Sequence, residues 1–171
     1  MKVSIKNNAQ GGFTLIELIV VIVILGILAA TALPKFASMA GDARWASVNA
    51  ARGALSSTAA MAHSKYLVDP TVAKALSLKV EDTTMTLTST GYPQADANAA
   101  AAAGLADGVD YKVLTKTTAT GTNDPVPTAT QITLVPLSIY GTPTAKKCFV
   151  TYDSGATPPT VTATGNATDC N

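Results

Sequence analysis

One acidic side chain stands inside a long apolar run near the start of the chain. Phe13 to Leu33 is a stretch of 21 residues in which Glu17 is the only ionisable one. A charge deep in a bilayer costs about 2.5–3.5 kcal/mol on insertion scales, so an acid in such a segment calls for a partner. No Lys, Arg or His lies between Lys6 and Lys35, so a partner from this chain must come from outside the apolar run.

Cleavage of the chain would supply a cation close to that acid. A cut between Gly12 and Phe13 would create a new amine one helical turn before Glu17. An acid and an amine about 4 Å apart attract by roughly 4 kcal/mol at an effective dielectric of 20. In a bundle of identical helices, the acid of one subunit could meet the amine of the next.

The only two cysteines, Cys148 and Cys170, lie near the C-terminus. An even number of cysteines in an exported chain favours one disulfide, and the alternative is two buried free thiols. If the chain entropy of the unfolded state is what counts, closing the loop between Cys148 and Cys170 with a disulfide stabilises the fold by roughly 3 kcal/mol.

Other residues that could do chemistry are sparse. His63 is the only histidine and has no Cys or Asp at ligand spacing, which favours a packed or solvated helix residue over a metal ligand. The Asp-Ser-Gly at Asp153 is a turn signal without the second copy that a carboxylate dyad needs, and Asn166-Ala-Thr alone is weak evidence for glycosylation. No phosphate-binding loop, zinc spacing or Ser-His-Asp set can be assembled. We therefore expect no enzymatic activity, no cofactor and no metal site.

The apolar run is long enough to cross a membrane as a helix. At about 1.5 Å per residue it reaches roughly 30 Å, the thickness of a bilayer core. Lys2 and Lys6 precede it without an acid, so the positive-inside rule leaves the first twelve residues in the cytoplasm and places the rest outside. One alternative is a secretory signal peptide cut near Ala32, although such apolar cores usually have only 7–15 residues. A plain membrane anchor would leave Glu17 unexplained.

The helical pattern resumes beyond the apolar run. From Lys35 to Val68, apolar residues recur at spacings of three and four: Val48, Ala51, Leu55, Ala59, Ala62 and Tyr66. We predict one long helix from Phe13 to Val68, with its second half packed on a sheet. Gly26 and Pro34 should weaken or kink this helix, because an interior proline removes a hydrogen bond and clashes with the preceding turn. For Pro34, a simple kink at the membrane surface is an equal alternative.

After Pro70 the sequence is typical of short strands. Apolar residues alternate in the stretches that begin at Thr84, Val109, Thr130 and Lys147, and Gly, Pro and Asn gather between them. A weaker stretch from Pro159 fits an edge strand or a loop. The alanine-rich segment from Ala95 fits a short helix or a surface loop. Together these patterns predict a small antiparallel sheet lying on the helix.

Composition limits the partners. The chain has 171 residues, of which 47% are hydrophobic and 13% charged, and its net charge is +1. A chain so close to neutral lacks the excess of basic residues that binds a polyanion, so no nucleic acid is expected as a partner.

The sequence "GGFTLIEL" resembles the processing site of type IV prepilins. In that family a short basic leader ends in glycine, and Phe and an apolar helix follow, with Glu as the fifth residue of the mature chain. The resemblance implies cleavage after Gly12 by a prepilin peptidase and N-methylation of Phe13. It also implies polymerisation through the apolar helix, with Glu17 as the family's acid and Pro34 as the proline at its end. The implied fold is α+β, a long N-terminal helix on a small antiparallel sheet with a C-terminal disulfide loop.

This resemblance implies an organisation and a set of partners. Residues 1–12 would be the cleaved leader, 13–34 the transmembrane and filament-core helix, 35–69 its amphipathic half, and 70–171 the globular head. The chain would wait in the inner membrane and then join an extracellular pilus on the bacterial surface. Its partners would be copies of itself in a helical homopolymer, the prepilin peptidase, the inner-membrane assembly machinery, and a surface or glycan receptor.

The expected function is therefore that of a structural subunit of a type IV pilus that serves surface attachment and biofilm formation, with motility as a further role. Short matches at Asp42 ("DAR"), Asn49 ("NAARGAL") and Gly91 ("GYP") resemble pilins of the mannose-sensitive haemagglutinin (MSHA) type. One alternative is a pseudopilin of a type II secretion system, which the cysteine pair disfavours. The other is a secreted soluble binding module released at Ala32.

Overall fold

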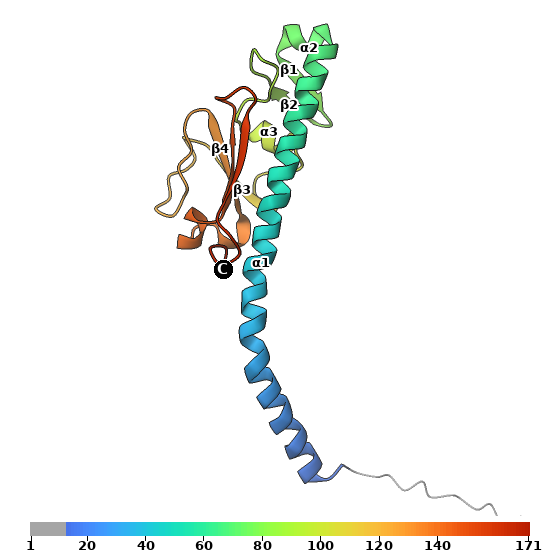
Figure 1. Ribbon diagram of the computed structural model, residues 1–171, viewed down its shortest axis with the longest axis vertical. Coiled ribbons are helices and arrows are strands. Elements are labelled where there is room, and N and C mark those ends of the chain that lie inside the picture. Colours follow the sequence, from blue (N-terminus) through green and yellow to red (C-terminus); the bar gives the residue numbers. More distant parts are fainter. Residues whose placement is uncertain (1–12) are drawn as a thin grey trace, which may run out of the picture. The chain divides into compact units, whose positions relative to one another are not determined.

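The computed structural model describes residues 13–171, apart from the side chains of residues 37 and 38. Its elements in chain order are α1 (Leu15–Val68), α2 (Pro70–Ala75), β1 (Ser77–Val80), β2 (Thr83–Thr86), α3 (Ala97–Ala102), β3 (Tyr111–Leu114), β4 (Gln131–Pro136), η1 (Leu137–Ile139), η2 (Pro143–Lys146), β5 (Phe149–Asp153) and β6 (Thr160–Thr164) (Figure 1). The chain forms two compact units, Met1–Ala37 and Ser38–Asn171. Helix α1 continues through the boundary between them.

The predicted single long helix is confirmed as α1, which begins at Leu15 and ends at Val68 with Pro34 inside it. In its second half one face is buried, and this face carries the predicted residues Val48, Ala51, Leu55, Ala59 and Ala62. Tyr66, at the end of the same row, is half-buried. Three of the five buried residues are alanines, so the backbone of α1 can approach the sheet closely.

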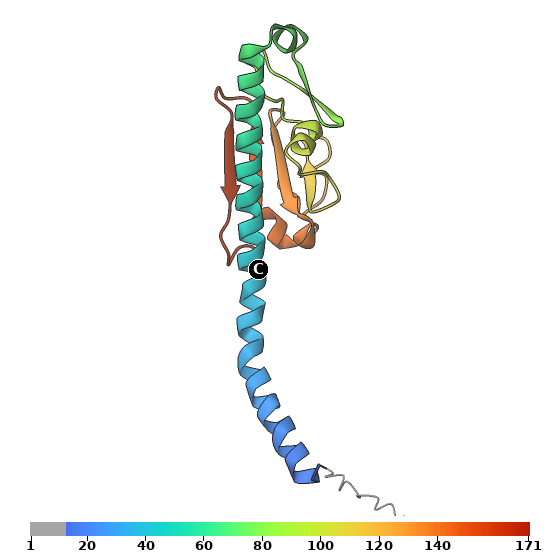
Figure 2. The same cartoon turned by 90° about the vertical axis from the view of Figure 1, so that its right-hand side faces the viewer.

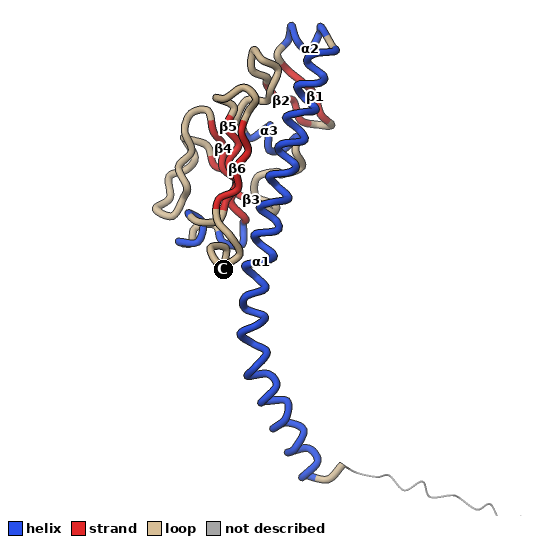
Figure 3. The backbone as a smooth tube through the Cα atoms, viewed as in Figure 1, coloured by secondary structure: helices blue, strands red, loops and turns tan. Residues whose placement is uncertain are grey.

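The sheet beneath this half of α1 has four antiparallel strands in the order β3-β4-β5-β6 (Figures 2 and 3). Its inner side chains include Ile132, Leu134, Val150 and Tyr152, which are fully or almost fully buried in one core with the α1 face. Along β5 buried residues alternate with half-buried ones, and along β6 half-buried residues alternate with exposed ones, which is the pattern of strands with one covered face. The weaker stretch from Pro159, for which the sequence allowed an edge strand or a loop, is the edge strand β6.

A second, two-stranded antiparallel sheet pairs β1 with β2 and packs on the far end of α1. The sequence interpretation contained neither β1 nor α2. The Asp69-Pro70 pair follows the end of α1 and starts α2: the Asp69 side chain accepts a hydrogen bond from the Thr71 amide, and Pro70 occupies the first turn. Proline is well suited to that position because the first amides of a helix have no partner inside the helix.

The alanine-rich segment is the short helix α3. The side chain of Asp96 caps it by accepting a hydrogen bond from the Ala99 amide at 2.9 Å, and Ala99 and Ala100 are buried. At the other end of the chain, a disulfide joins Cys148, just before β5, to Cys170. The predicted C-terminal disulfide loop is therefore present, and it encloses all of β5 and β6.

Candidate assembly site

The first turn of α1 is closed by two side chains. Thr14 precedes the helix, and its amide and hydroxyl both donate to Glu17 Oε2, at 2.8 and 2.7 Å. In return the Glu17 amide donates to Thr14 Oγ1 at 3.3 Å. This reciprocal arrangement is a capping box, which gives partners to amides that a helix start leaves without them.

Thr14 is a helix-capping residue that the sequence interpretation did not include. The signal was present, because a Thr followed three residues later by Glu before an apolar run is typical of a capping box. The capping box gives Glu17 a role within its own chain, in addition to the expected pairing with a cation. It also fixes the carboxylate beside Thr14, the neighbour of Phe13. In the described part of the chain, the Oε1 oxygen of Glu17 accepts no hydrogen bond, so one oxygen remains for a group from outside.

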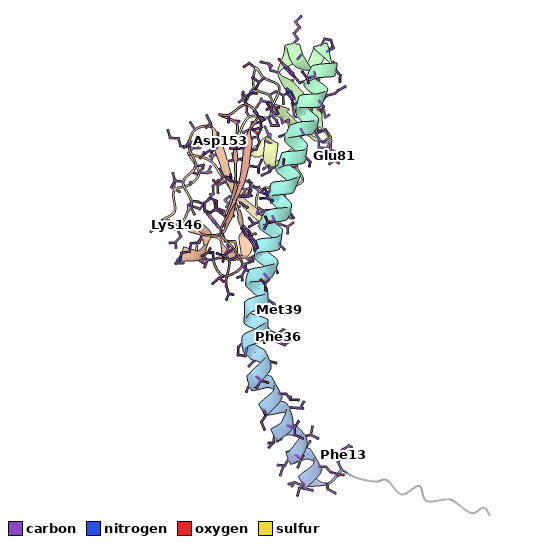
Figure 4. All side chains as sticks on the ribbon, viewed as in Figure 1. Phe13, Phe36, Met39, Glu81, Lys146 and Asp153 are labelled. Atoms are coloured by element: carbon purple, nitrogen blue, oxygen red, sulfur yellow. A yellow bond between two sulfur atoms is a disulfide. The ribbon has the colours of Figure 1, made fainter. Side chains whose placement is uncertain are left out.

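The apolar residues that follow are uncovered in the single subunit. Phe13 is 89% exposed, and the large hydrophobic side chains of this segment remain between about half and three-quarters exposed. Side chains project all around the helix, with Phe13 and Phe36 labelled in Figure 4. Among the described residues, one helix is long and apolar enough to span a membrane, and its most apolar 18-residue window has a mean hydropathy of 2.8 with no residue buried. Such a surface requires lipid or other apolar helices around it.

Gly26 and Pro34 both lie inside α1. A Cβ on Gly26 would meet nothing within 4 Å, so no contact in the subunit requires a glycine there. Thr31, three residues before the proline, donates its hydroxyl to the Leu28 carbonyl at 2.9 Å. Back-bonding of this kind often bends helices, so it adds to the effect expected of Pro34. The kink itself stays a prediction.

The two buried cysteines hold the C-terminal loop against the rest of the head. Their Cα atoms are 5.1 Å apart. Arg44 on α1 donates from Nη1 to the Cys170 carbonyl at 2.9 Å and from Nε to Ser138 Oγ at 3.3 Å. The disulfide and Arg44 together tie the end of the chain to β5 and to α1.

The remaining candidates have structural roles. His63 lies on α1 with its Nδ1 2.9 Å from the Thr90 carbonyl, and its ring stacks on Tyr92 with the centroids 4.2 Å apart. Asp153 ends β5 and accepts hydrogen bonds from Gln131 Nε2 and from the Gly155 amide, both at 2.8 Å. These bonds, of which that from Gln131 has the larger effect, lower the pKa of the Asp153 carboxyl.

Asn166 is exposed, and its side chain accepts hydrogen bonds from the amides of Thr168 and Asp169. It therefore stabilises a turn in the C-terminal loop. Within residues 13–171, no three His, Cys, Asp or Glu side chains come together as metal ligands.

Two predicted site features remain untested. Gly12 lies outside the described residues, and so does the whole predicted leader 1–12. Cleavage after Gly12 and N-methylation of Phe13 therefore stay predictions.

Comparisons with known proteins agree with the geometry at this end of the chain. Residues 7–33 match the family described as the prokaryotic N-terminal methylation motif. Over 51 residues, or 30% of its length, the chain is 51% identical to the major component of the type IV narrow pilus of Thermus thermophilus, PilA5. The matched segment spans less than half of that relative, 44% of its length. No solved structure matches the chain.

These matches do not confirm the MSHA subtype. The family match covers residues 7–33, whereas the fold is that of the whole described chain: a long apolar helix, antiparallel sheets and a C-terminal disulfide. The N-terminal motif is that of the prokaryotic N-terminal methylation family, the matched segment is similar to a type IV pilin, and the fold fits the α+β fold of type IV pilins.

Proposed function

We propose that the chain is a structural subunit that waits in the inner membrane and polymerises into a type IV pilus. The observation that carries the proposal is the uncovered apolar first half of α1, headed by the capped carboxylate of Glu17. In the membrane, lipid covers this surface. In a fibre, the same segments of neighbouring subunits cover one another, and burial of apolar surface drives the transfer.

Glu17 sets the register of this packing. After cleavage at Gly12, the amine of Phe13 is the cation available to the apolar layer, and it meets the carboxylate of a neighbouring subunit. The capping box holds that carboxylate by Oε2 and leaves Oε1 for the neighbour. Contacts that repeat without closing generate a fibre.

The head would then form the outer surface of the fibre and carry its contacts with the environment. Attachment, biofilm formation and motility are the roles that we assign to such a fibre, with a surface or glycan receptor and the inner-membrane assembly machinery as further partners. Its role is structural, without catalysis.

A type II secretion pseudopilin is the second candidate, since it would use the same N-terminal helix. The disulfide Cys148–Cys170, which holds the end of the head in place, favours the pilus subunit. A secreted soluble module is disfavoured because α1 continues from the apolar segment into the head without a break at Ala32.

Mass analysis of protein sheared from the cell surface, combined with electron microscopy, tests the proposal. We expect fibres whose subunit begins at methylated Phe13. A subunit that begins near Ala32 would instead identify a signal peptide. Gly12→Leu should leave full-length precursor in the inner membrane and no fibres, whereas Gly26→Ala, a matched change within the helix, should still be cleaved.

A further inference from the structure

Strand β6 forms one edge of the four-stranded sheet and carries no cover. It pairs with β5 on one side only. In the described residues 13–171, no other hydrogen bond reaches Thr160–Thr164. Figure 2 shows this strand beside α1 with no further segment beyond it. Alternate backbone amides and carbonyls along β6 therefore face outward without partners among the described residues.

The opposite edge of the same sheet is covered. The segment before β3 folds over that strand: Asp107 Oδ1 accepts from the Val113 amide at 2.8 Å, and the Gly108 amide donates to the Tyr111 carbonyl at 2.9 Å. A salt bridge of 2.8 Å between Asp107 and Lys112 holds this cover in place. The fold thus blocks one edge and leaves the other open.

Strand β6 also lacks the usual devices that prevent edge pairing. Its sequence, Thr-Val-Thr-Ala-Thr, contains no charge, no proline and no bulge. Thr160, Thr162 and Thr164 are exposed on the outer face, while Val161 and Ala163 face the core. Natural sheets normally protect an open edge with lysine, proline or a twist, because such an edge is a template for another strand.

We propose that this edge pairs with β6 of a second copy of the chain, antiparallel about Thr162. In that register Thr162 lies opposite its own copy, Thr160 lies opposite Thr164, and Val161 lies opposite Ala163. Threonine pairs across antiparallel strands are favourable, and no like charges are brought together. The strand is bounded by Pro159 and Gly165, so a five-residue partner fits it fully and a longer partner strand gains nothing.

Antiparallel pairing of two identical strands about Thr162 relates the two copies by a two-fold axis. Because the axis reverses the direction of β6, it also reverses the direction of α1 in the partner copy. The paired subunits therefore belong to two fibres of opposite direction, so the inference rests on the proposed fibre function. One pair of short strands buries too little surface for a stable complex, whereas many pairs along two fibres act together.

Mixing of purified fibres tests the register, with electron microscopy and light scattering as readouts. Wild-type fibres should associate side by side. Fibres of Thr162→Lys alone, or of Thr162→Glu alone, should stay separate, because like charges lie opposite each other. A mixture of these two fibre types should associate again. Thr122→Lys, which places the same charge on an exposed loop away from the edge, should behave as wild type.

If fibres of Thr162→Lys or of Thr162→Glu associate like wild type, or if their mixture stays separate, edge pairing about Thr162 is wrong. If Thr162 variants do not assemble, fibres with lysine at both Thr160 and Thr164, alone and mixed with fibres that carry glutamate at both positions, provide the same test, since these positions face each other. The absence of any fibre from the wild-type chain would overturn the proposed function itself. Wild-type fibres that stay single would overturn only the pairing.

Discussion

At the scale of single residues, Glu17 serves two needs with one carboxylate. Its Oε2 closes the first turn of α1 through Thr14, and this contact exists in the isolated subunit. Pairing with the amine of a neighbouring subunit is proposed and needs the negative charge. The two roles differ in their chemistry, because glutamine can take part in a capping box but carries no charge.

Glu17→Gln separates these roles. If the charge is needed, this variant should be processed and inserted like wild type but should form few or no fibres, as Glu17→Val should. The reason is that an unpaired buried cation costs about 3–5 kcal/mol. Thr14→Ala keeps the charge and loses the cap, which costs about 0.5–2 kcal/mol, so fibres should still form. The measurement compares fibres sheared from cells with processed subunit left in the membrane.

Normal fibre yields from Glu17→Gln, with a loss in Glu17→Val, would instead assign the acid to the cap. Abundant fibres from both variants would mean that neither role is needed for assembly.

At the scale of elements, the join between α1 and the C-terminal loop depends on a glycine. Gly41 lies buried on α1, and a Cβ there would clash with the Ala167 carbonyl. Gly53 lies twelve residues further along the same helix, and a Cβ there would meet nothing within 4 Å. The two glycines therefore provide a matched pair.

Gly53→Ala should raise the free energy of unfolding by about 0.5–1 kcal/mol, because alanine is the better helix former. Gly41→Ala should lower it, since either the loop or the helix must shift and loosen the Arg44 contact with Cys170. Thermal unfolding of the full chain in detergent measures both. An equal gain in stability from the two substitutions would show that the loop moves aside without cost.

The disulfide is the second join at this scale. Cys148→Ser should lower the free energy of unfolding of the head by about 2–5 kcal/mol and make the segment from β5 to the C-terminus sensitive to protease. Helix α1 should keep its membrane insertion, because its apolar half does not depend on the loop. Cys170→Ser should behave in the same way. Full protease resistance of both variants would mean that packing alone holds the segment.

At the scale of the whole molecule, several carboxylates are stabilised in the folded state. The Thr71 hydroxyl and Lys65 hold the pKa of the Asp69 carboxyl well below its usual range, and Gln131 lowers the pKa of Asp153. For Asp107, burial acts to raise the pKa, but hydrogen bonds from Lys112 and the Val113 amide outweigh it and lower the value.

A lowered folded pKa means that the unfolded chain binds protons first as pH falls. The stability from these groups is therefore fully present above the unfolded value, near 4, and is lost as pH falls through the folded values. We expect an unfolding temperature that changes little between about pH 5 and 7 and drops below about pH 4. Asp153→Asn should flatten that drop in a pH series followed by circular dichroism. An identical acid dependence in the variant would assign the effect to other groups.

Many features of this protein follow from local rules of residue type and spacing. The apolar length, the lone Glu17 and the helical spacing of Val48, Ala51 and Leu55 required a long helix with a membrane-compatible half and one buried face. Alternation in the threonine-rich segments indicated strands, because a strand with one covered face has a period of two. The even pair of cysteines indicated a bond in an exported head. The capping box at Thr14 could also have been read from the sequence.

Other features depend on which segments of the chain meet in three dimensions. Strand β1 has weak alternation and takes its form from pairing with β2. The stretch from Pro159 could have been a loop, and it is a strand because β5 supplies a ladder of partners along its full length. The difference between the covered β3 edge and the open β6 edge also appears only in three dimensions. It arises because Asp107 folds back onto β3, whereas within residues 13–171 no charged side chain or flanking segment forms a hydrogen bond with β6.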